Sequence, residues 1–316
     1  MNPLKSALAC AAALALAAPA AAQSAPTWQT QALDAAASVL EEGYIHPEVA
    51  DRLAARLRED PDRFAAMDNR REFARAVTED LFEIANDRHL ALIFSPDGDA
   101  EPAAPDEAAE AARAERIRFC RETPLTAESL EGGAGYILLP RFRGEDSFLE
   151  AFDAAMTEFA DAPAIILDVR GSCGGGPHFV RHISTYFFDA PTHLTSTESR
   201  HRGSGERWTY EDVPGPRFTG RPLIILTDRG TFSAAESFTF GLKAVGRAVS
   251  IGEATGGGGH FGGTQRLTDD FTIFVPQGRT FDPRTGEGWE ATGIEPDVET
   301  SSEDALQAAL DWLAAR

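Results

Sequence analysis

Apolar residues recur at helical spacing through the first third of the chain. They form one apolar stripe on each of two segments, which is the pattern of amphipathic helices packed on a core. The residues in these stripes are Leu33, Ala36, Val39 and Leu40 in the first segment and Phe73, Val77, Leu81 and Ile84 in the second. We therefore predict a small N-terminal helical domain over residues 27–95. Residues 96–116, rich in Pro, Gly, Asp, Glu and Ala, show no apolar face before Ala111 and predict an acidic linker.

From residue 117 onwards, short apolar runs alternate with amphipathic helical segments. Continuous apolar runs are typical of strands that are buried on both faces of a parallel sheet. The predicted strands cover residues 135–139, 164–168, 223–227, 248–252 and 272–275, and the predicted helices cover 148–159, 178–188, a segment that starts at Ser233, and 303–315. This alternation predicts a largely parallel sheet with right-handed crossovers. The fold class is therefore α/β, with residues 117–316 as the αβ core.

The first 22 residues have the features of a secretory signal peptide. Lys5 supplies a positive charge, residues 7–16 are apolar, and Ala20 to Ala22 form a small-residue cleavage site before Gln23. The apolar run is too short to span a bilayer. Cys10 is not in a good lipid-attachment motif, because Ala7 stands where leucine is preferred. We predict cleavage and export to the periplasm or the medium.

The net charge limits the possible partners. A formal charge of −21 leaves no electrostatic footprint for nucleic acid and disfavours anionic lipid.

Beyond the signal peptide the chain has two cysteines, Cys120 and Cys173. Export would permit a bridge between them, but two cysteines do not make a disulfide framework, so we predict free buried thiols.

Ser233 stands at a junction that suits a nucleophile. The apolar run 223–227 leads into a polar turn that contains Gly230, and a helix-like pattern begins at the serine. Backbone N–H groups at a helix N-terminus are unpaired, so the N–H of Ala234 can receive a developing negative charge. An alternative remains, because Ser233 and Glu236 also fit a capping box in which the serine only satisfies the helix end.

A second glycine-rich loop follows the apolar run 164–168. It lacks the endings of phosphate and dinucleotide loops, so we predict no cofactor, and the chain shows no metal-binding motif. Because carboxyl ends of parallel strands share one sheet edge, this loop and Ser233 should lie together. Gly174 can then supply a second N–H to an oxyanion. Asp168 and Arg170 are secondary candidates for the site, but the interpretation we favour for them is an ion pair that braces the loop.

A nucleophilic serine needs a base. Lys243 lies ten residues further along the same predicted helix, about 15 Å from the serine, which excludes a Ser-Lys dyad. Two histidines are contenders: His89 at a helix-to-strand junction and His260 after four glycines. Each also has an ordinary interpretation as a surface or loop residue. Glu290 is a candidate for the carboxylate that orients the base.

Five motifs, in order between about residues 30 and 313, resemble the tail-specific (C-terminal processing) serine peptidase family. The resemblance is closest to the branch shared by the tricorn core and interphotoreceptor retinoid-binding protein. The motifs are Asp87-Arg88-His89-Leu90, Asp168-Val169-Arg170-Gly171-Ser172-Cys173-Gly174-Gly175, Thr231-Phe232-Ser233-Ala234-Ala235-Glu236, Gly252-Glu253-Ala254-Thr255-Gly256-Gly257-Gly258-Gly259-His260, and Trp289-Glu290-Ala291-Thr292-Gly293-Ile294-Glu295-Pro296-Asp297.

The resemblance implies a crotonase-like αβ core after a helical piece, and an exported serine-type endopeptidase that acts on peptides or proteins. It implies Ser233 as nucleophile, His89 as base and Glu290 as orienting acid. Gly258 stands where one branch has its lysine, and Arg88 stands where the tricorn-like branch has a second serine. The segment before residue 117 leaves no room for the PDZ domain of many members. The retinoid-binding relatives imply an alternative, a non-catalytic periplasmic carrier of apolar ligands.

Overall fold

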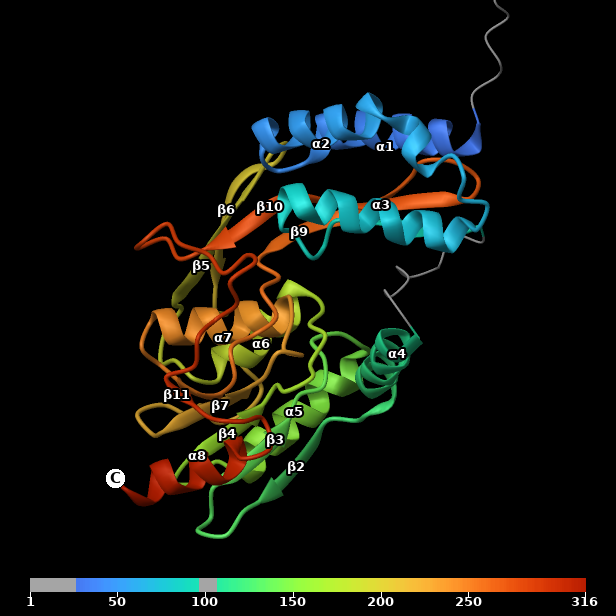
Figure 1. Cartoon of the computed structure of the whole chain (residues 1–316). Helices are drawn as coiled ribbons and strands as arrows, with labels where there is room; N and C mark the ends of the chain where they lie inside the picture. The colour runs from blue at the N-terminus through green and yellow to red at the C-terminus, as the bar shows by residue number, and fades with distance from the viewer. Residues whose placement is uncertain (1–26, 97–106) are drawn as a thin grey trace, which may run out of the picture.

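The structure is a computed structural model, and it describes residues 27–96 and 107–316. The expected signal peptide, residues 1–22, lies outside the described residues. Within the described ranges, no helix combines the length and the apolar character needed to cross a membrane. Figure 1 shows two lobes, the upper one with the N-terminal helices and the lower one with most of the core.

The upper lobe begins with the predicted helices. The two predicted apolar stripes lie on α1 (Trp28–Gly43) and α3 (Arg70–Ala85). Between them are α2 (Pro47–Glu59) and the short 3-10 helix η1 (Pro61–Phe64), and strand β1 (Ala91–Phe94) follows α3. Thr27 caps α1 through its side-chain oxygen, and Asn69 caps α3 in the same way. Asn86 ends α3 in the left-handed conformation that commonly terminates a helix. The chain therefore turns sharply just before His89.

An antiparallel sheet of five strands lies beside these helices. Its order is β1-β10-β5-β6, and β9 pairs with β10. The further strands are β5 (His193–Ser199), β6 (Gly203–Trp208), β9 (His260–Arg266) and β10 (Phe271–Phe281). The apolar pattern predicted only the first part of β10. Strands β5, β6 and β9 were not predicted, because their sequences are polar or glycine-rich, as in the His-Phe-Gly-Gly-Thr-Gln-Arg run of β9.

Strand β10 completes the core of the upper lobe. Its apolar side chains Phe271, Ile273 and Val275 are buried in one cluster with Leu33 of α1 and Val77 of α3. At its start β10 pairs with β1, and at its end it pairs with β5. The apolar faces of the N-terminal helices are thus covered by a strand from the last fifth of the chain.

The lower lobe contains the predicted parallel sheet. The order is β11-β8-β7-β4-β3-β2, and every pair is parallel except β2 with β3. The strands are β2 (Thr126–Ser129), β3 (Gly135–Leu138), β4 (Ile165–Asp168), β7 (Leu223–Thr227), β8 (Val249–Gly252) and β11 (Val298–Glu299). The α/β class with preceding helices is therefore confirmed.

Helices cover both faces of this sheet (Figure 1). On one face lie α5 (Asp146–Glu158), α6 (Pro177–Thr185) and α7 (Ala234–Ala244), and on the other lies α8 (Ala305–Ala314). Successive side chains of a strand point to opposite faces. Accordingly Ile165 and Leu167 join the core under α5 to α7, whereas Ile166 joins the core under α8. This two-sided burial explains the continuous apolar runs.

Two expectations are wrong in this region. Residues 107–116, predicted as linker, belong to helix α4 (Glu107–Glu122), whose Ala, Glu and Arg content favours helix without an apolar stripe. Cys120 and Cys173, predicted as free thiols, are joined in a disulfide with their Cα atoms 6.2 Å apart. The end of α4 packs on the loop after β4, because Phe119 contacts Gly171. That packing, which the sequence pattern does not reveal, brings the cysteines together.

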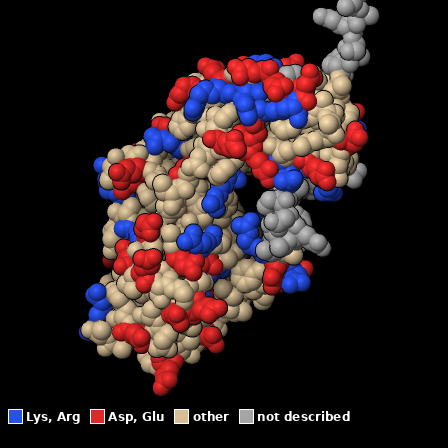
Figure 2. Space-filling view, viewed as in Figure 1, with Lys and Arg blue, Asp and Glu red and all other residues tan. Residues whose placement is uncertain are grey.

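Acidic side chains are spread over the visible face, and basic ones gather over α1 and α2 at the top (Figure 2). In α2, Arg56 is 2.8 Å from Asp80 and Arg58 is 2.5 Å from Glu41. Much of this positive charge is therefore already paired with carboxylates of the same lobe.

Candidate active site

Ser233 occupies a strained position directly before α7. Its φ of 57° and ψ of −117° lie in a region that residues with a β-carbon rarely adopt. The turn that leads from β7 to α7 forces this conformation and leaves the serine beside a cavity. Such strain at a residue that lines a cavity is typical of a functional site.

Glu236 holds this turn in place. Its buried carboxylate accepts hydrogen bonds from the N–H of Ser233 at 2.8 Å, and from the N–H groups of Gly257 and Gly258 at 2.7 and 2.8 Å. The hydroxyl of Thr255 donates to it as well, at 2.6 Å. The capping box expected from Ser233 and Glu236 is therefore present, and the same carboxylate also ties the glycine loop before β9 to Ser233. Burial raises the pKa of Glu236, and these hydrogen bonds oppose the rise.

Gly174 lies against the turn that carries Ser233. A β-carbon at this position would be 2.6 Å from the amide nitrogen of Ala234 and 2.9 Å from the Cβ of Ser233. Its φ of +76° adds a second reason why only glycine fits. Among the described residues, neither the N–H of Gly174 nor that of Ala234 has a hydrogen-bond acceptor. Both can therefore donate to a ligand over Ser233.

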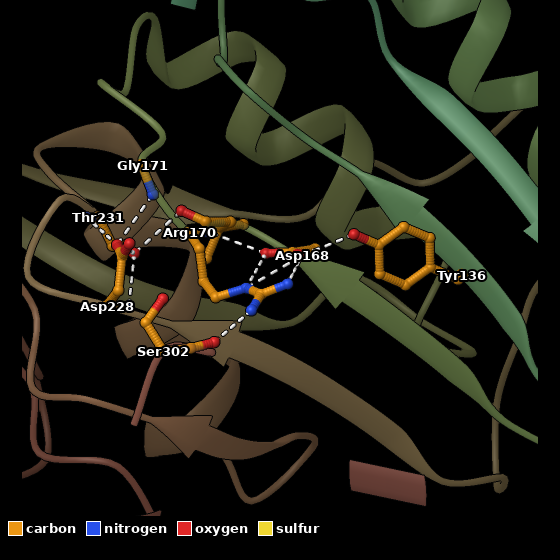
Figure 3. A network of polar contacts seen from close by, with 8 residues as sticks. Tyr136, Asp168, Arg170, Gly171, Asp228, Thr231 and Ser302 are labelled. Carbon is orange, nitrogen blue, oxygen red and sulfur yellow. Dashed lines mark hydrogen bonds and ion pairs between the residues drawn. The ribbon is translucent and has the colours of Figure 1, made fainter. Parts of the chain in front are cut away.

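Asp168 and Arg170 brace the loop that carries Gly174 (Figure 3). The Arg170 guanidinium pairs with Asp168 at 2.5 Å and also donates to the carbonyl of Ser302. The hydroxyl of Tyr136 donates to Asp168 at 2.6 Å. These contacts support the bracing interpretation of Asp168 and Arg170, with both side chains satisfied by protein groups.

Asp228 joins this loop to the turn that precedes Ser233 (Figure 3). One of its oxygens accepts from the N–H of Gly171 at 2.8 Å, and from the N–H and hydroxyl of Thr231 at 2.9 and 3.1 Å. Sequence reasoning missed this residue. The only available signal was its place directly after a buried strand, at the sheet edge where ligands bind.

His89 lies between the two lobes. Its ring centroid is 4.7 Å from that of Phe232, the residue before Ser233, and 5.7 Å from that of Phe274 in β10. Its Nδ1 is buried without a hydrogen-bond partner among the described residues. Burial lowers the pKa of His89 to about 4. The ring is therefore neutral over most of the working pH range, as a general base must be.

Glu290 reaches the same place from the loop after β10. Its Oε2 accepts from the N–H of His260 at 2.6 Å, while Oε1 is buried with no partner among the described residues. Burial, with a smaller contribution from Asp87, raises the pKa of Glu290 to about 7. One ring nitrogen of His89 and one carboxylate oxygen from each of Asp87 and Glu290 lie within 4.8 Å of one another.

His260 is the second histidine at this point, and it lines the same cavity as Ser233. Its Nδ1 lies 2.7 Å from Asp87 Oδ2, which also accepts from the hydroxyl of Tyr44 at 3.1 Å. In the described structure neither His260 nor His89 is hydrogen-bonded to Ser233. The fold thus brings Ser233, both histidines and Glu290 into one region, and adds Asp87.

Asp87, His89 and Glu290 also have the donor types that bind a divalent cation. Asp87, however, already uses both oxygens: Oδ1 accepts from the N–H of His89, and Oδ2 accepts from Tyr44 and contacts His260. The group is therefore better described as a hydrogen-bonded network than as a prepared metal site.

Lys243 lies at the far end of α7 from Ser233. Its ammonium donates to Ser250 Oγ and to the carbonyl of Glu295, each at 2.6 Å, and lies 3.2 Å from Asp297. The helix thus separates the lysine from the serine, as the spacing predicted.

Comparison with known proteins places these features in a family. The model of peptidase family S41 matches residues 133–300. Carboxyl-terminal-processing peptidase 3 of Arabidopsis thaliana is 29% identical over 155 residues, which cover 48% of this chain and 29% of that protein. A tricorn protease homologue of Streptomyces coelicolor is 28% identical over 190 residues, which cover 59% of this chain and 15% of that protein. The chain thus spans less than a third of the length of either relative.

A solved structure extends the similarity to the whole fold. The photosystem II D1 C-terminal processing protease aligns with a TM-score of 0.59 at 16% identity, over 88% of this chain and 94% of that one. The family model covers more than half of the chain and includes both glycine loops and the turn that carries Ser233. The resemblance drawn from the motifs is therefore confirmed, and this chain belongs to peptidase family S41.

Proposed function

We propose that the protein hydrolyses peptide bonds by a serine mechanism. Ser233 attacks the carbonyl carbon, His89 takes the serine proton and later passes it to the leaving amine, and Glu290 orients the imidazole. The N–H groups of Gly174 and Ala234 stabilise the oxyanion. The observation that carries the proposal is the placement of these two free N–H groups directly beside a strained serine.

His89 and Glu290 complement one another in this proposal. Each has a buried polar atom without a partner: a ring nitrogen of the histidine and a carboxylate oxygen of the glutamate. Leaving such atoms unpaired is unfavourable by about 1–3 kcal/mol each. A hydrogen bond between His89 Nδ1–H and Glu290 Oε1 satisfies both atoms and turns Nε2 towards the reacting serine, and catalytic hydrogen bonds often tighten only when substrate binds.

Export belongs to the same proposal. The disulfide between Cys120 and Cys173 is of a kind that persists in oxidising compartments. The predicted signal peptide over residues 1–22 would deliver the chain to such a compartment. We therefore propose that the enzyme acts in the periplasm or in the medium.

Covalent labelling tests the hydrolytic function against the carrier function. A fluorophosphonate probe should modify Ser233 in the native protein, and the modified peptide should be identified by mass spectrometry. A carrier would instead remain unlabelled and bind a fluorescent fatty acid or retinoid saturably. Unlabelled protein that binds such a ligand would replace the peptidase proposal with the carrier.

We expect kcat/KM to rise with pH around pH 7. An ordinary histidine base would produce a rise between about pH 6 and 7. Here the lowered pKa of His89 moves its own limb to about 4, and Glu290, with a pKa raised to about 7, must ionise to support the imidazolium. In kcat/KM measured from pH 3 to 10, Glu290→Gln should remove the rise near 7. A rise that survives in Glu290→Gln would assign it to another group.

A further inference from the structure

A cavity of about 340 Å³ opens beside Ser233, where β5, β6, β9, α6 and α7 meet. Much of its wall is apolar. The apolar side chains that line it include Val180, Leu194, Trp208, Phe261 and Trp289. A cavity of this size and character can take an apolar side chain of a peptide whose carbonyl lies over the serine.

The charged residues in this wall are of one sign. Among the described residues that line the cavity are Arg181 and Arg207, and none of them is Asp or Glu. The chain as a whole carries 50 acidic and 29 basic residues. A cavity wall with two arginines and no carboxylate therefore opposes the general charge of the protein.

Arg207 has no competing partner. Its backbone pairs with Thr195 across the β5–β6 ladder, and Thr195 also lines the cavity. Its neighbours Glu206 and Trp208 are hydrogen-bonded to each other, through the indole N–H and Oε2 at 2.8 Å. Within the described ranges, no ion pair or hydrogen bond involves the Arg207 guanidinium. Its donors are therefore available to a ligand in the cavity.

Arg181 is held more firmly, beside the same opening. Its Nε donates to the carbonyl of Trp208, and its guanidinium lies 3.9 Å from the ring centroid of Tyr210. These contacts fix the direction of the side chain and leave its terminal nitrogens unused among the described residues. Two guanidinium groups at one opening favour a carboxylate, because both can donate charge-assisted hydrogen bonds to it.

We propose that this cavity selects peptides that present a carboxylate to Arg181 and Arg207, next to an apolar residue at the cleaved bond. The proposal rests on the hydrolytic function proposed above and adds a substrate class to it. An acidic side chain and the carboxyl terminus of a peptide offer the same chemistry. The two sources are separated by experiment.

Three internally quenched peptides test the proposal on the mature enzyme. The first has Glu beside an apolar residue and blocked termini, the second has Gln instead, and the third is the Gln peptide with a free carboxyl terminus. A carboxylate-bearing peptide should have a kcat/KM about tenfold above that of the blocked Gln peptide. The advantage should shrink as salt is raised, because the arginines are exposed.

Variants identify the residues responsible. In Arg207→Gln, the ratio of kcat/KM for the favoured peptide to kcat/KM for the blocked Gln peptide should fall close to one. Arg207→Glu should instead favour a blocked peptide with Lys in place of Gln. Arg118→Gln is the matched control, because Arg118 is exposed on α4 and does not line the cavity. This control should keep the tenfold ratio.

Equal kcat/KM for all three peptides, in enzyme that a fluorophosphonate labels, would overturn the carboxylate selection and leave the hydrolytic function standing. An advantage that persists undiminished in both Arg207→Gln and Arg181→Gln would overturn it as well. An enzyme that cleaves none of the peptides and takes no label would overturn both proposals.

Discussion

Replacement of Ser233 by alanine should lower kcat by about 10⁴- to 10⁶-fold with little change in fold. Loss of one member of a serine–histidine–acid unit removes nearly the whole contribution of that unit. The remaining rate comes from substrate binding and from the N–H groups of Gly174 and Ala234. Single-turnover cleavage of a quenched peptide, together with loss of fluorophosphonate labelling, measures the effect. Ser129→Ala, an exposed change on β2, is the control and should retain both activities.

Backbone strain at Ser233 supplies a second readout. Alanine keeps the β-carbon, so the φ of 57° stays unfavourable. Glycine adopts this region without that penalty, so the free energy of unfolding of Ser233→Gly should exceed that of Ser233→Ala by roughly 1 kcal/mol. Ser233→Gly should therefore unfold at a higher temperature. A Ser233→Ala protein that is folded and cleaves peptide at the original rate would rule the serine out as nucleophile.

Replacement of His89 by alanine should be almost as damaging, by about 10⁴-fold or more in kcat. The reason is that the serine then has no base, since Lys243 is bound at the other end of α7. His260→Ala should cost much less, about tenfold, through loss of the side-chain contact with Asp87, because the backbone N–H that donates to Glu290 is kept. His201→Ala, which removes an exposed histidine in the turn between β5 and β6, controls for the removal of an imidazole.

The reverse ranking would assign a different base. If His260→Ala abolishes turnover and His89→Ala does not, the base is the cavity-lining His260 and not His89. The carboxylate that orients the base is then Asp87 and not Glu290. Asp87→Asn then gives the deciding comparison. Only if His260 is the base should Asp87→Asn lower turnover as much as His260→Ala does. Thermal unfolding of each variant must accompany the kinetics, since Asp87 is fully buried.

The parts of the fold that could be predicted are those in which local sequence decides structure. Strands β4 and β7 are buried on both faces, and their uninterrupted apolar runs show it. The turn before Ser233 combines a strand end, a glycine and a helix start within a few residues. Its position, and the neighbouring Gly174 loop, therefore followed from the sequence. The chemical roles of these residues remain predictions.

Features that depend on distant contacts could not be predicted. Asp87 and His260 are 173 residues apart, and nothing in either local sequence announces their contact. Helix α4 has high helix propensity but no apolar stripe, so its composition was mistaken for a linker. Strand β6 is almost entirely exposed, and β9 alternates only between exposed and partly buried residues after His260, with glycines and polar residues in both strands. Tertiary packing, and not propensity, decides such segments.

Strand β10 makes the order of synthesis matter. The ribosome releases α1, α2 and α3 long before Phe271, Ile273 and Val275, whose side chains complete the core of those helices. Pairing of β1 with β10 closes a loop of most of the chain, and such distant contacts form slowly. His89, two residues before β1, acquires its final surroundings only after this closure. The proposed site can therefore form only after β10 has been synthesised, and by the same argument we expect it to assemble late in folding.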